Sequence, residues 1–298
     1  MSSTSASTPA APAVAARGIL LMVAAMGCLA SMDAASKSLV DDYSVWQLLF
    51  VRHAVLLVFC LAWFGPLRAA GALRSRRPVL QIVRVTALVV EMALFMLAIR
   101  HLPLADTHAI LAASPLVVTA LAWPVLGEAV GPRRWAAVMV GFVGVLIIIR
   151  PGSTVFQAAA LLPLLGAGLW AVYQVLTRLT ARDDSGLTAF MYLVVAGVAG
   201  PGVVMPWLWV TPGSWADVSL FAAVAAFGAL GHVCLLLSLR TAPASTLQPF
   251  SYTLLIWATL WGFVFFGDVP DLWTWLGGVT VVASGLYTWQ RERRTTRG

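Results

Sequence analysis

The feature that most constrains this sequence is a series of apolar runs, each about as long as a lipid bilayer is thick. A membrane-spanning helix needs about 20 mainly apolar residues, and short polar turns separate such runs along most of the 298-residue chain. Because the bilayer core offers no partners to backbone polar groups, runs of this length predict helices. We mark ten spans: 18–39, 44–64, 79–100, 103–126, 133–150, 157–178, 187–209, 216–239, 243–266 and 271–289.

Composition supports a membrane protein over a soluble one. Hydrophobic residues make up 60% of the chain and charged residues 10%, whereas soluble domains carry roughly 25% charged residues. The net charge of +7 could suggest nucleic acid, but the basic residues stand in short loops between apolar runs. We therefore expect the protein to have the lipid bilayer, and no nucleic acid, as its partner.

The distribution of basic residues predicts the orientation. With the N-terminus in the cytoplasm, fourteen basic residues fall on the inner side: Arg17, Arg68, Arg74, Arg76, Arg77, Arg133, Arg134, Arg178, Arg182, Arg240, Arg291, Arg293, Arg294 and Arg297. Only Lys37, Arg100 and Arg150 fall outside. The positive-inside rule then predicts a multi-pass protein of the bacterial inner membrane with both termini cytoplasmic. Residues 1–17 are expected to form a disordered tail and residues 291–298 a basic tail.

An internal repeat recurs at an offset near 140 residues. The segment from Arg100 to Pro103 aligns with the segment from Arg240 to Pro243, and Gly127-Glu128 aligns with Gly267-Asp268. The halves 18–150 and 151–290 would each hold five spans, and an odd number inverts the second copy in the membrane. Inverted repeats are common in secondary transporters, whose sites lie between the repeats near the midplane. We expect an all-α membrane protein with ten transmembrane helices in two inverted five-helix repeats around a central cavity.

This pattern resembles the drug/metabolite transporter superfamily, in its ten-span EamA-like branch. The resemblance rests on the span count, the five-plus-five repeat, the acidic residue after Gly127 and Gly267, and the mid-helix Pro115. The second half departs from it, with Leu255 at the position equivalent to Pro115 and a proline earlier, at Pro249. The resemblance implies a central cavity lined by spans 1, 3, 4, 6, 8 and 9. Many members export amino acids, and the chain is similar to a branch that exports aromatic ones.

Ionisable residues inside the predicted spans are few: Asp33, Arg52, His53, Arg84, Glu91, Asp106, His108 and His232. A charge at the bilayer centre costs about 2.5–3.5 kcal/mol or more, so such side chains must face protein or water. Glu91 lies near the middle of its span, with Phe95 one turn on and on the same face, so both are candidates for substrate binding. We expect Glu91 to bind a substrate amine or a proton, the alternative being a structural carboxyl group. His108 is a second candidate for proton coupling.

Polar groups also recur at corresponding places in the two halves. Asp33 aligns with Gln174, and His232 lies one position from the match of Glu91. Asp33, Gln174 and His232 are therefore candidates for substrate binding. A structural pair between Asp33 and Arg52 is the alternative for Asp33. Arg84, near a span end, is expected to extend its charge toward the interface.

Two helix faces extend the predicted site. Trp170, Tyr173 and Gln174 follow helical spacing on the sixth span and suit an aromatic or amino-acid substrate; helix packing is the alternative. Thr253 lies on a similar face of the ninth span. Pro115 and Pro249 each remove a helical hydrogen bond, so they are expected to act in gating or as simple kinks.

The combined prediction is a secondary transporter that exports a small metabolite by alternating access, with aromatic or other neutral amino acids as the first substrate candidates. A nucleoside, a flavin or S-adenosylmethionine is the alternative substrate. A membrane enzyme or a scaffold is the alternative of another class, but no catalytic motif is found, and we predict no catalytic residue. Cys28, Cys60 and Cys234 lack metal-ligand spacing, so neither a metal nor another cofactor is expected. The many glycines inside the spans suit helix packing, and a homodimer contact is an alternative use for them.

Overall fold

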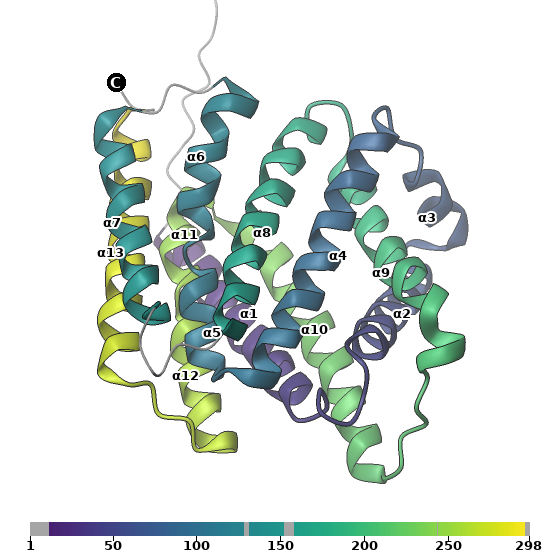
Figure 1. The fold of residues 1–298 in the computed structure, drawn as a ribbon. Coiled ribbons are helices and arrows are strands. Elements are labelled where there is room, and N and C mark those ends of the chain that lie inside the picture. The colour runs from purple at the N-terminus through teal and green to yellow at the C-terminus, as the bar shows by residue number, and fades with distance from the viewer. Residues whose placement is uncertain (1–11, 128–130, 152–157, 243, 296–298) are drawn as a thin grey trace, which may run out of the picture.

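The computed structural model describes residues 12–127, 131–151, 158–242 and 244–295, and these residues form helices joined by short turns (Figure 1). The first half contains α1 (Pro12–Lys37), α2 (Val45–Phe64), α3 (Pro66–Ala72), α4 (Pro78–His101), α5 (Leu104–Leu111), α6 (Ser114–Leu126) and α7 (Pro132–Ile149). The second half contains the 3₁₀ turn η1 (Ala158–Ala160), α8 (Leu161–Thr180), α9 (Gly186–Leu208), α10 (Trp215–Thr241), α11 (Ala244–Ser251), α12 (Thr253–Phe266) and α13 (Leu272–Thr295).

Eight stretches of the described chain are long and apolar enough to cross a membrane, compared with the ten that we predicted. Two predicted spans fall short. The segment of α7 from Trp135 to Ile149 is apolar but short, and α13 is rich in Trp, Thr and Gly, which lower its mean hydropathy. Large apolar side chains such as Leu67 and Val203 are exposed, as a lipid-facing surface requires.

The fourth predicted span of each half is two helices instead of one. The span 103–126 is broken between α5 and α6, and the span 243–266 between α11 and α12. At the first break the N–H of Ala113 donates to the carbonyl of Ile110, and at the second the N–H of Tyr252 donates to that of Pro249. These bonds span three residues instead of four, which tightens the backbone into a 3₁₀-like turn.

The two breaks lie at equivalent places of the repeat. Leu111 and Ser251 end the helices before the breaks, 140 positions apart, and both broken spans stop at a glycine with positive φ, Gly127 (70°) and Gly267 (69°). A positive φ is the left-handed conformation that glycine adopts without a steric cost. Glu128, which follows Gly127, lies outside the described residues.

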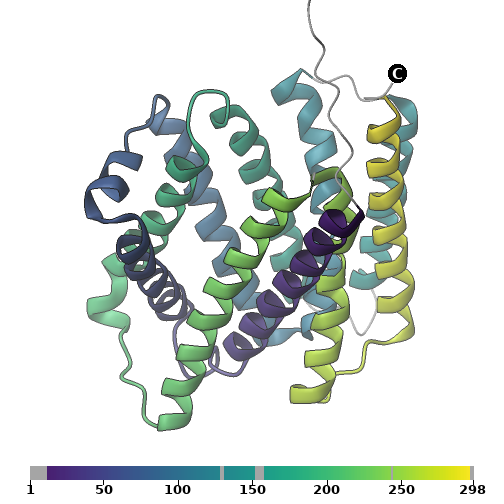
Figure 2. The ribbon, with the colours of Figure 1, turned by 180° about the vertical axis from the view of Figure 1, so that it is seen from behind.

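The helices pack mainly against partners from the other half. The pairs with the most extensive contact are α1 with α10, α4 with α8, α2 with α9, and α7 with α13. Helix α4 descends in Figure 1 whereas its repeat counterpart α10 ascends, and Figure 2 shows the same reversal from behind. This reversed course supports the inverted duplication, which remains a prediction. The contacts between these helix pairs form a long seam between the halves through the middle of the bundle.

The ends of the chain differ from the sequence prediction in extent. Helix α1 begins at Pro12, six residues before the predicted start of the first span, and α13 continues to Thr295, beyond the predicted end at 289. Of the predicted tails, residues 1–11 and 296–298 lie outside the described residues.

Candidate functional site

Glu91 lies at the seam between the halves. It belongs to α4 and is only 4% exposed. A methyl group added at Gly166 of α8 would lie 3.9 Å from Glu91 Cγ and 4.0 Å from its Oε1, so the absence of a side chain there gives the carboxyl group room. Among the described residues no hydrogen bond to this carboxyl group is present, although Arg52 interacts with it electrostatically. Glu91 is therefore a buried acid without a fixed partner.

A second acid–base pair lies close by, between α1 and α5. Nε2 of His108 lies 3.2 Å from Oδ2 of Asp33, and both side chains are buried. Neither ring nitrogen of His108 has a hydrogen-bond partner among the described residues, and the contact with Asp33 is an ion pair only when the imidazole is protonated. The ring of Phe95, from α4, lies 4.9 Å from the imidazole, centre to centre. The structure thus brings together three of the predicted site residues from three helices.

The alternative pairing of Asp33 with Arg52 is not the one found. Asp33 has His108 as its ion-pair partner, and the Arg52 guanidinium donates to the sulfur atoms of Met32 and Met92. Arg52 and Asp33 still interact electrostatically. The direction in which each side chain leaves its helix decided the partner.

The aromatic stripe of α8 lies against α4. The rings of Trp170 and Tyr173 are 5.4 Å apart, and both pack with the buried Leu88 of α4. Gln174 is half-buried. The stripe therefore borders the same seam as Glu91, one to two turns farther along α8 than Gly166.

Arg84 is buried, so the expectation that it extends to the interface is wrong. It is 1% exposed, and its guanidinium donates to Gln81 Oε1, Thr177 Oγ1 and the carbonyl oxygen of Ala189 at 2.9, 3.2 and 2.6 Å. It also stacks over the ring of Tyr173 at 5.1 Å. The acceptors on α8 and α9 are about 90 to 105 residues away in sequence, so no local pattern could have revealed them.

The other predicted residues lie on α6, α10, α11 and α12. His232 of α10 is half-buried, and its Nδ1–H donates to the carbonyl of Gly228 at 2.7 Å. Thr253 begins α12 and donates to the carbonyl of Phe250. Pro115 is the second residue of α6, directly after the first break, whereas Pro249 lies inside α11, three residues before the second break. Both prolines thus accompany a break, but on opposite sides of it.

Different polar contacts tie the halves together at the two ends of the bundle. At one end, the bottom in Figure 1, Nζ of Lys37 lies 3.0 Å from Oδ2 of Asp268, donates to the carbonyl of Leu102 at 2.9 Å, and lies 4.9 Å from the centre of the Phe266 ring. This contact joins α1 and α4 of the first half to the end of α12 in the second.

At the opposite end Asp184, in the turn between α8 and α9, holds the turn before α4. It accepts hydrogen bonds from the Ser75 hydroxyl, the Arg76 backbone N–H and the Gln81 side-chain amide. Partial burial by itself raises the pKa of Asp184, but the hydrogen bonds from Gln81, Ser75 and Arg76 outweigh burial, so the pKa lies below its ordinary value. Sequence reasoning missed this network, because only the fold brings the two turns together.

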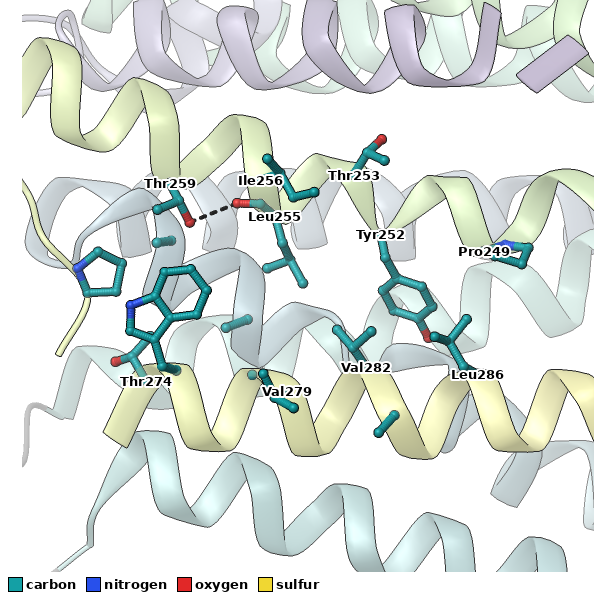
Figure 3. Close-up of a pocket in the computed structure, with 16 residues that line it drawn as sticks. Pro249, Tyr252, Thr253, Leu255, Ile256, Thr259, Thr274, Val279, Val282 and Leu286 are labelled. Carbon is teal, nitrogen blue, oxygen red and sulfur yellow. Dashed lines mark hydrogen bonds between the residues drawn. The ribbon is translucent and has the colours of Figure 1, made fainter. Parts of the chain in front are cut away.

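A pocket of about 500 Å³ lies between α5, α12 and α13, and neither Glu91 nor the His108–Asp33 pair lines it. Figure 3 shows the side chains of Leu255, Val279 and Val282 among those that surround it. Pro249 and Thr253 lie on its border, but its other walls are largely apolar and include no ionisable side chain except the Tyr252 phenol. The pocket therefore lacks the charged groups that meet at the seam.

The described residues contain no group of three or more His, Cys, Asp and Glu side chains that could hold a metal ion. The ionisable groups near Glu91 are the Asp33 carboxyl group, the His108 imidazole and the Arg52 guanidinium. Groups of this kind can bind or exchange protons and pair with charged groups of a small solute.

A profile of the EamA-like transporter family matches residues 16–150 and 157–289. The chain is 29% identical over 249 residues to a riboflavin transporter of Rhizobium johnstonii, covering 83% of this chain and 82% of that protein. It is 29% identical over 275 residues to the pseudopaline exporter CntI of Pseudomonas aeruginosa (90% and 94%), and 25% identical over 248 residues to an S-adenosylmethionine uptake transporter of Rickettsia prowazekii (83% and 82%). A crystal structure with 20% sequence identity superposes with a TM-score of 0.59 over 94% of this chain and 99% of that one, which shows the fold alone.

Proposed function

Since the chain belongs to the EamA-like transporter family, within the drug/metabolite transporter superfamily, and is a multi-pass membrane protein, we propose that it is a secondary transporter of a small metabolite. It would act in a bacterial inner membrane with both termini cytoplasmic. Its first substrate candidates are amino acids, aromatic or otherwise neutral, which it would export. The relatives named for riboflavin and for S-adenosylmethionine make these two solutes the second candidates.

The observation that carries the proposal is the gathering of buried ionisable groups at the seam. Asp33, Glu91 and His108 come from three helices, and Arg52 interacts electrostatically with both carboxyl groups. Buried charge in a membrane is expensive and marks substrate or proton pathways. A carboxyl group without a fixed partner, as at Glu91, suits a substrate amine, which the carrier must both bind and release.

Alternating access gives this arrangement a mechanism. The two halves would rock about the seam, so that the end at Lys37 and Asp268 and the end at Asp184 open in turn. The helix breaks between α5 and α6 and between α11 and α12 would absorb part of the motion, with Pro115 and Pro249 beside them. Glu91 or His108 would take up a proton if export is coupled to the proton gradient.

The experiment is flux into proteoliposomes with purified full-length protein. Vesicles loaded with unlabelled phenylalanine, riboflavin or S-adenosylmethionine would be diluted into the same labelled solute, with protein-free vesicles as the control. We expect counterflow of phenylalanine, and its acceleration by an imposed pH gradient if coupling operates. Counterflow of riboflavin or S-adenosylmethionine alone would replace the amino acid as substrate, and no flux of any of the three would contradict the carrier assignment for these solutes.

A further inference from the structure

The two buried arginines of the first half differ in what their guanidinium groups contact. A guanidinium carries five N–H donors and accepts nothing. Arg84 satisfies its donors with three oxygen atoms, as described above. Arg52, 7% exposed in α2, has only two hydrogen-bond acceptors among the described residues: Met32 Sδ at 3.5 Å and Met92 Sδ at 2.9 Å. A thioether sulfur is a weak acceptor, so the Arg52 cation is buried without the oxygen partners that Arg84 has.

A very small cavity lies beside Arg52. The side chain borders an internal cavity of about 10 Å³, together with Met92, Gly228 and His232, which is about the space that one water molecule occupies. A methyl group at Gly228 would lie 3.8 Å from Cγ and Cδ of Arg52 and 3.0 Å from the sulfur of Met32. Without a side chain at Gly228, α10 can approach Met32 and Arg52 closely.

The histidines beside this cavity offer Arg52 no anionic partner. Nδ1–H of His53 donates to the carbonyl of Leu49 at 2.8 Å, and Nδ1–H of His232 donates to that of Gly228. The acids that interact with Arg52, Asp33 and Glu91, do so through space and not through hydrogen bonds. The N–H donors of the Arg52 guanidinium therefore remain available to a ligand group that carries oxygen acceptors.

We propose that Arg52 binds a carboxylate of the transported solute, and this inference rests on the carrier function proposed above. The planar guanidinium matches a carboxylate with two parallel hydrogen bonds. Asp33 and Glu91 are acids that interact electrostatically with Arg52, so they would attract a positively charged amine on the same solute. A doubly charged phosphate suits the site less well, because the two acids would repel its second charge. The solute class is thus an amino acid or a related zwitterion.

The test is binding of matched pairs to the purified full-length protein in detergent. Phenylalanine is compared with phenethylamine, and S-adenosylmethionine with its decarboxylated form, by ligand-dependent thermal stabilisation. We expect the acid of at least one pair to bind at least tenfold more tightly than its decarboxylated partner. Arg52→Met should reduce this preference to less than threefold. Arg52→Lys, which keeps the charge but not the fork, should retain an intermediate preference and serves if Arg52→Met does not fold.

The matched control is Arg84→Lys, which alters the other buried guanidinium. It should lower thermal stability and leave the preference for the acid unchanged. Equal binding of both members of each pair, no binding of either acid at 10 mM, or an undiminished preference in both Arg52 variants overturns the inference. Wild-type riboflavin flux that persists in Arg52→Met, without any acid preference, would keep the carrier and remove this site. A strong preference for the acid without flux of any solute would keep this site and contradict the carrier function.

Discussion

The helix break of the first half lies between α5 and α6, next to the buried His108 and Asp33, while that of the second half lies between α11 and α12, next to the apolar pocket around Tyr252. The backbone repeats, down to the glycine with positive φ that ends each broken span. The buried charges do not repeat, because Asp33, Arg52, Glu91 and His108 all belong to the first half. The two halves thus show a similar order of helices but differ in where their buried ionisable groups lie.

The largest expected effect tests this asymmetry at two corresponding positions. Glu91→Gln removes the buried acid of α4, and His232→Gln changes the polar residue at nearly the same place of α10. We expect Glu91→Gln to lower export of an amine-bearing solute at least tenfold, about 1.4 kcal/mol, and His232→Gln to lower it less than threefold. Proteoliposome flux measures both.

Asp42→Asn is the control for Glu91→Gln, since it removes an exposed carboxylate of a loop. It should leave flux unchanged. Equal losses in the Glu91 and His232 variants would mean that the two halves share the chemistry, and unchanged, pH-insensitive flux in Glu91→Gln would exclude proton coupling through Glu91.

The second prediction concerns α7 of the first half and α13 of the second, which meet at two glycines. A methyl group at Gly277 would lie 2.5 Å from the carbonyl oxygen of Gly144, and one at Gly144 would lie 2.9 Å from that of Gly277. We expect each Gly→Ala change to destabilise the protein by about 1–3 kcal/mol through forced separation of the helices. Thermal unfolding in detergent measures the loss.

Gly200→Ala is the matched control, because nothing lies within 4 Å of the added methyl group. Removing this glycine from a helix should be neutral or stabilise by up to about 1 kcal/mol. A loss confined to Gly277→Ala or to Gly144→Ala would show that the contact is not shared equally by the two helices.

The third prediction compares the two ends of the bundle through Asp184. Its folded pKa is depressed, so ionised Asp184 stabilises the folded state above the unfolded pKa of about 3.9, and this contribution is lost as pH falls through the folded pKa. Asp184→Asn should lower stability at pH 7 by about 1 kcal/mol, after allowance for solvent screening. The difference from wild type should shrink as the pH approaches 3 in melting curves, and a pH-independent difference would contradict this account.

The smallest expected effect is at the other end. Lys37→Met removes the cross-half ion pair with Asp268, which is partly exposed, so we expect a loss of stability of less than about 1 kcal/mol. Flux should change about two- to threefold, since the end at Lys37 and Asp268 would open more readily. The same change in Lys37→Arg, which keeps the charge, would contradict the role of the ion pair.

Most of the helix plan followed from the sequence, because bilayer thickness fixes the length of an apolar helix. The prolines Pro115 and Pro249 indicated an irregularity in each of the two broken spans, but not the residue at which the helix stops. The breaks lie at 112–113 and at Tyr252, on opposite sides of the two prolines, and the hydrogen-bond pattern shows where they are. The shortfall of α13 came from its Trp and Thr residues, which suit a membrane interface or a helix contact but lower the mean hydropathy.

The sequence indicated the residues of the candidate site better than it indicated which residues they contact. The cost of buried charge singled out Asp33, Glu91 and His108 from sequence alone. Periodicity gives the depth and face of a side chain on its own helix, but the partner depends on how helices from distant parts of the chain are rotated against each other. For this reason Arg84 was placed at the interface, whereas its partners on α8 and α9 hold it inside.

The contact between Gly144 and Gly277 has a mechanical consequence for any carrier motion. Two backbones this close cannot slide past each other by a residue, because the neighbouring Ile148 and Val281 side chains would collide with the opposite helix. They could still tilt against each other, because a contact between two backbones without side chains can serve as a pivot. In the proposed rocking motion, movement at one end of the bundle would then be accompanied by the opposite movement at the other.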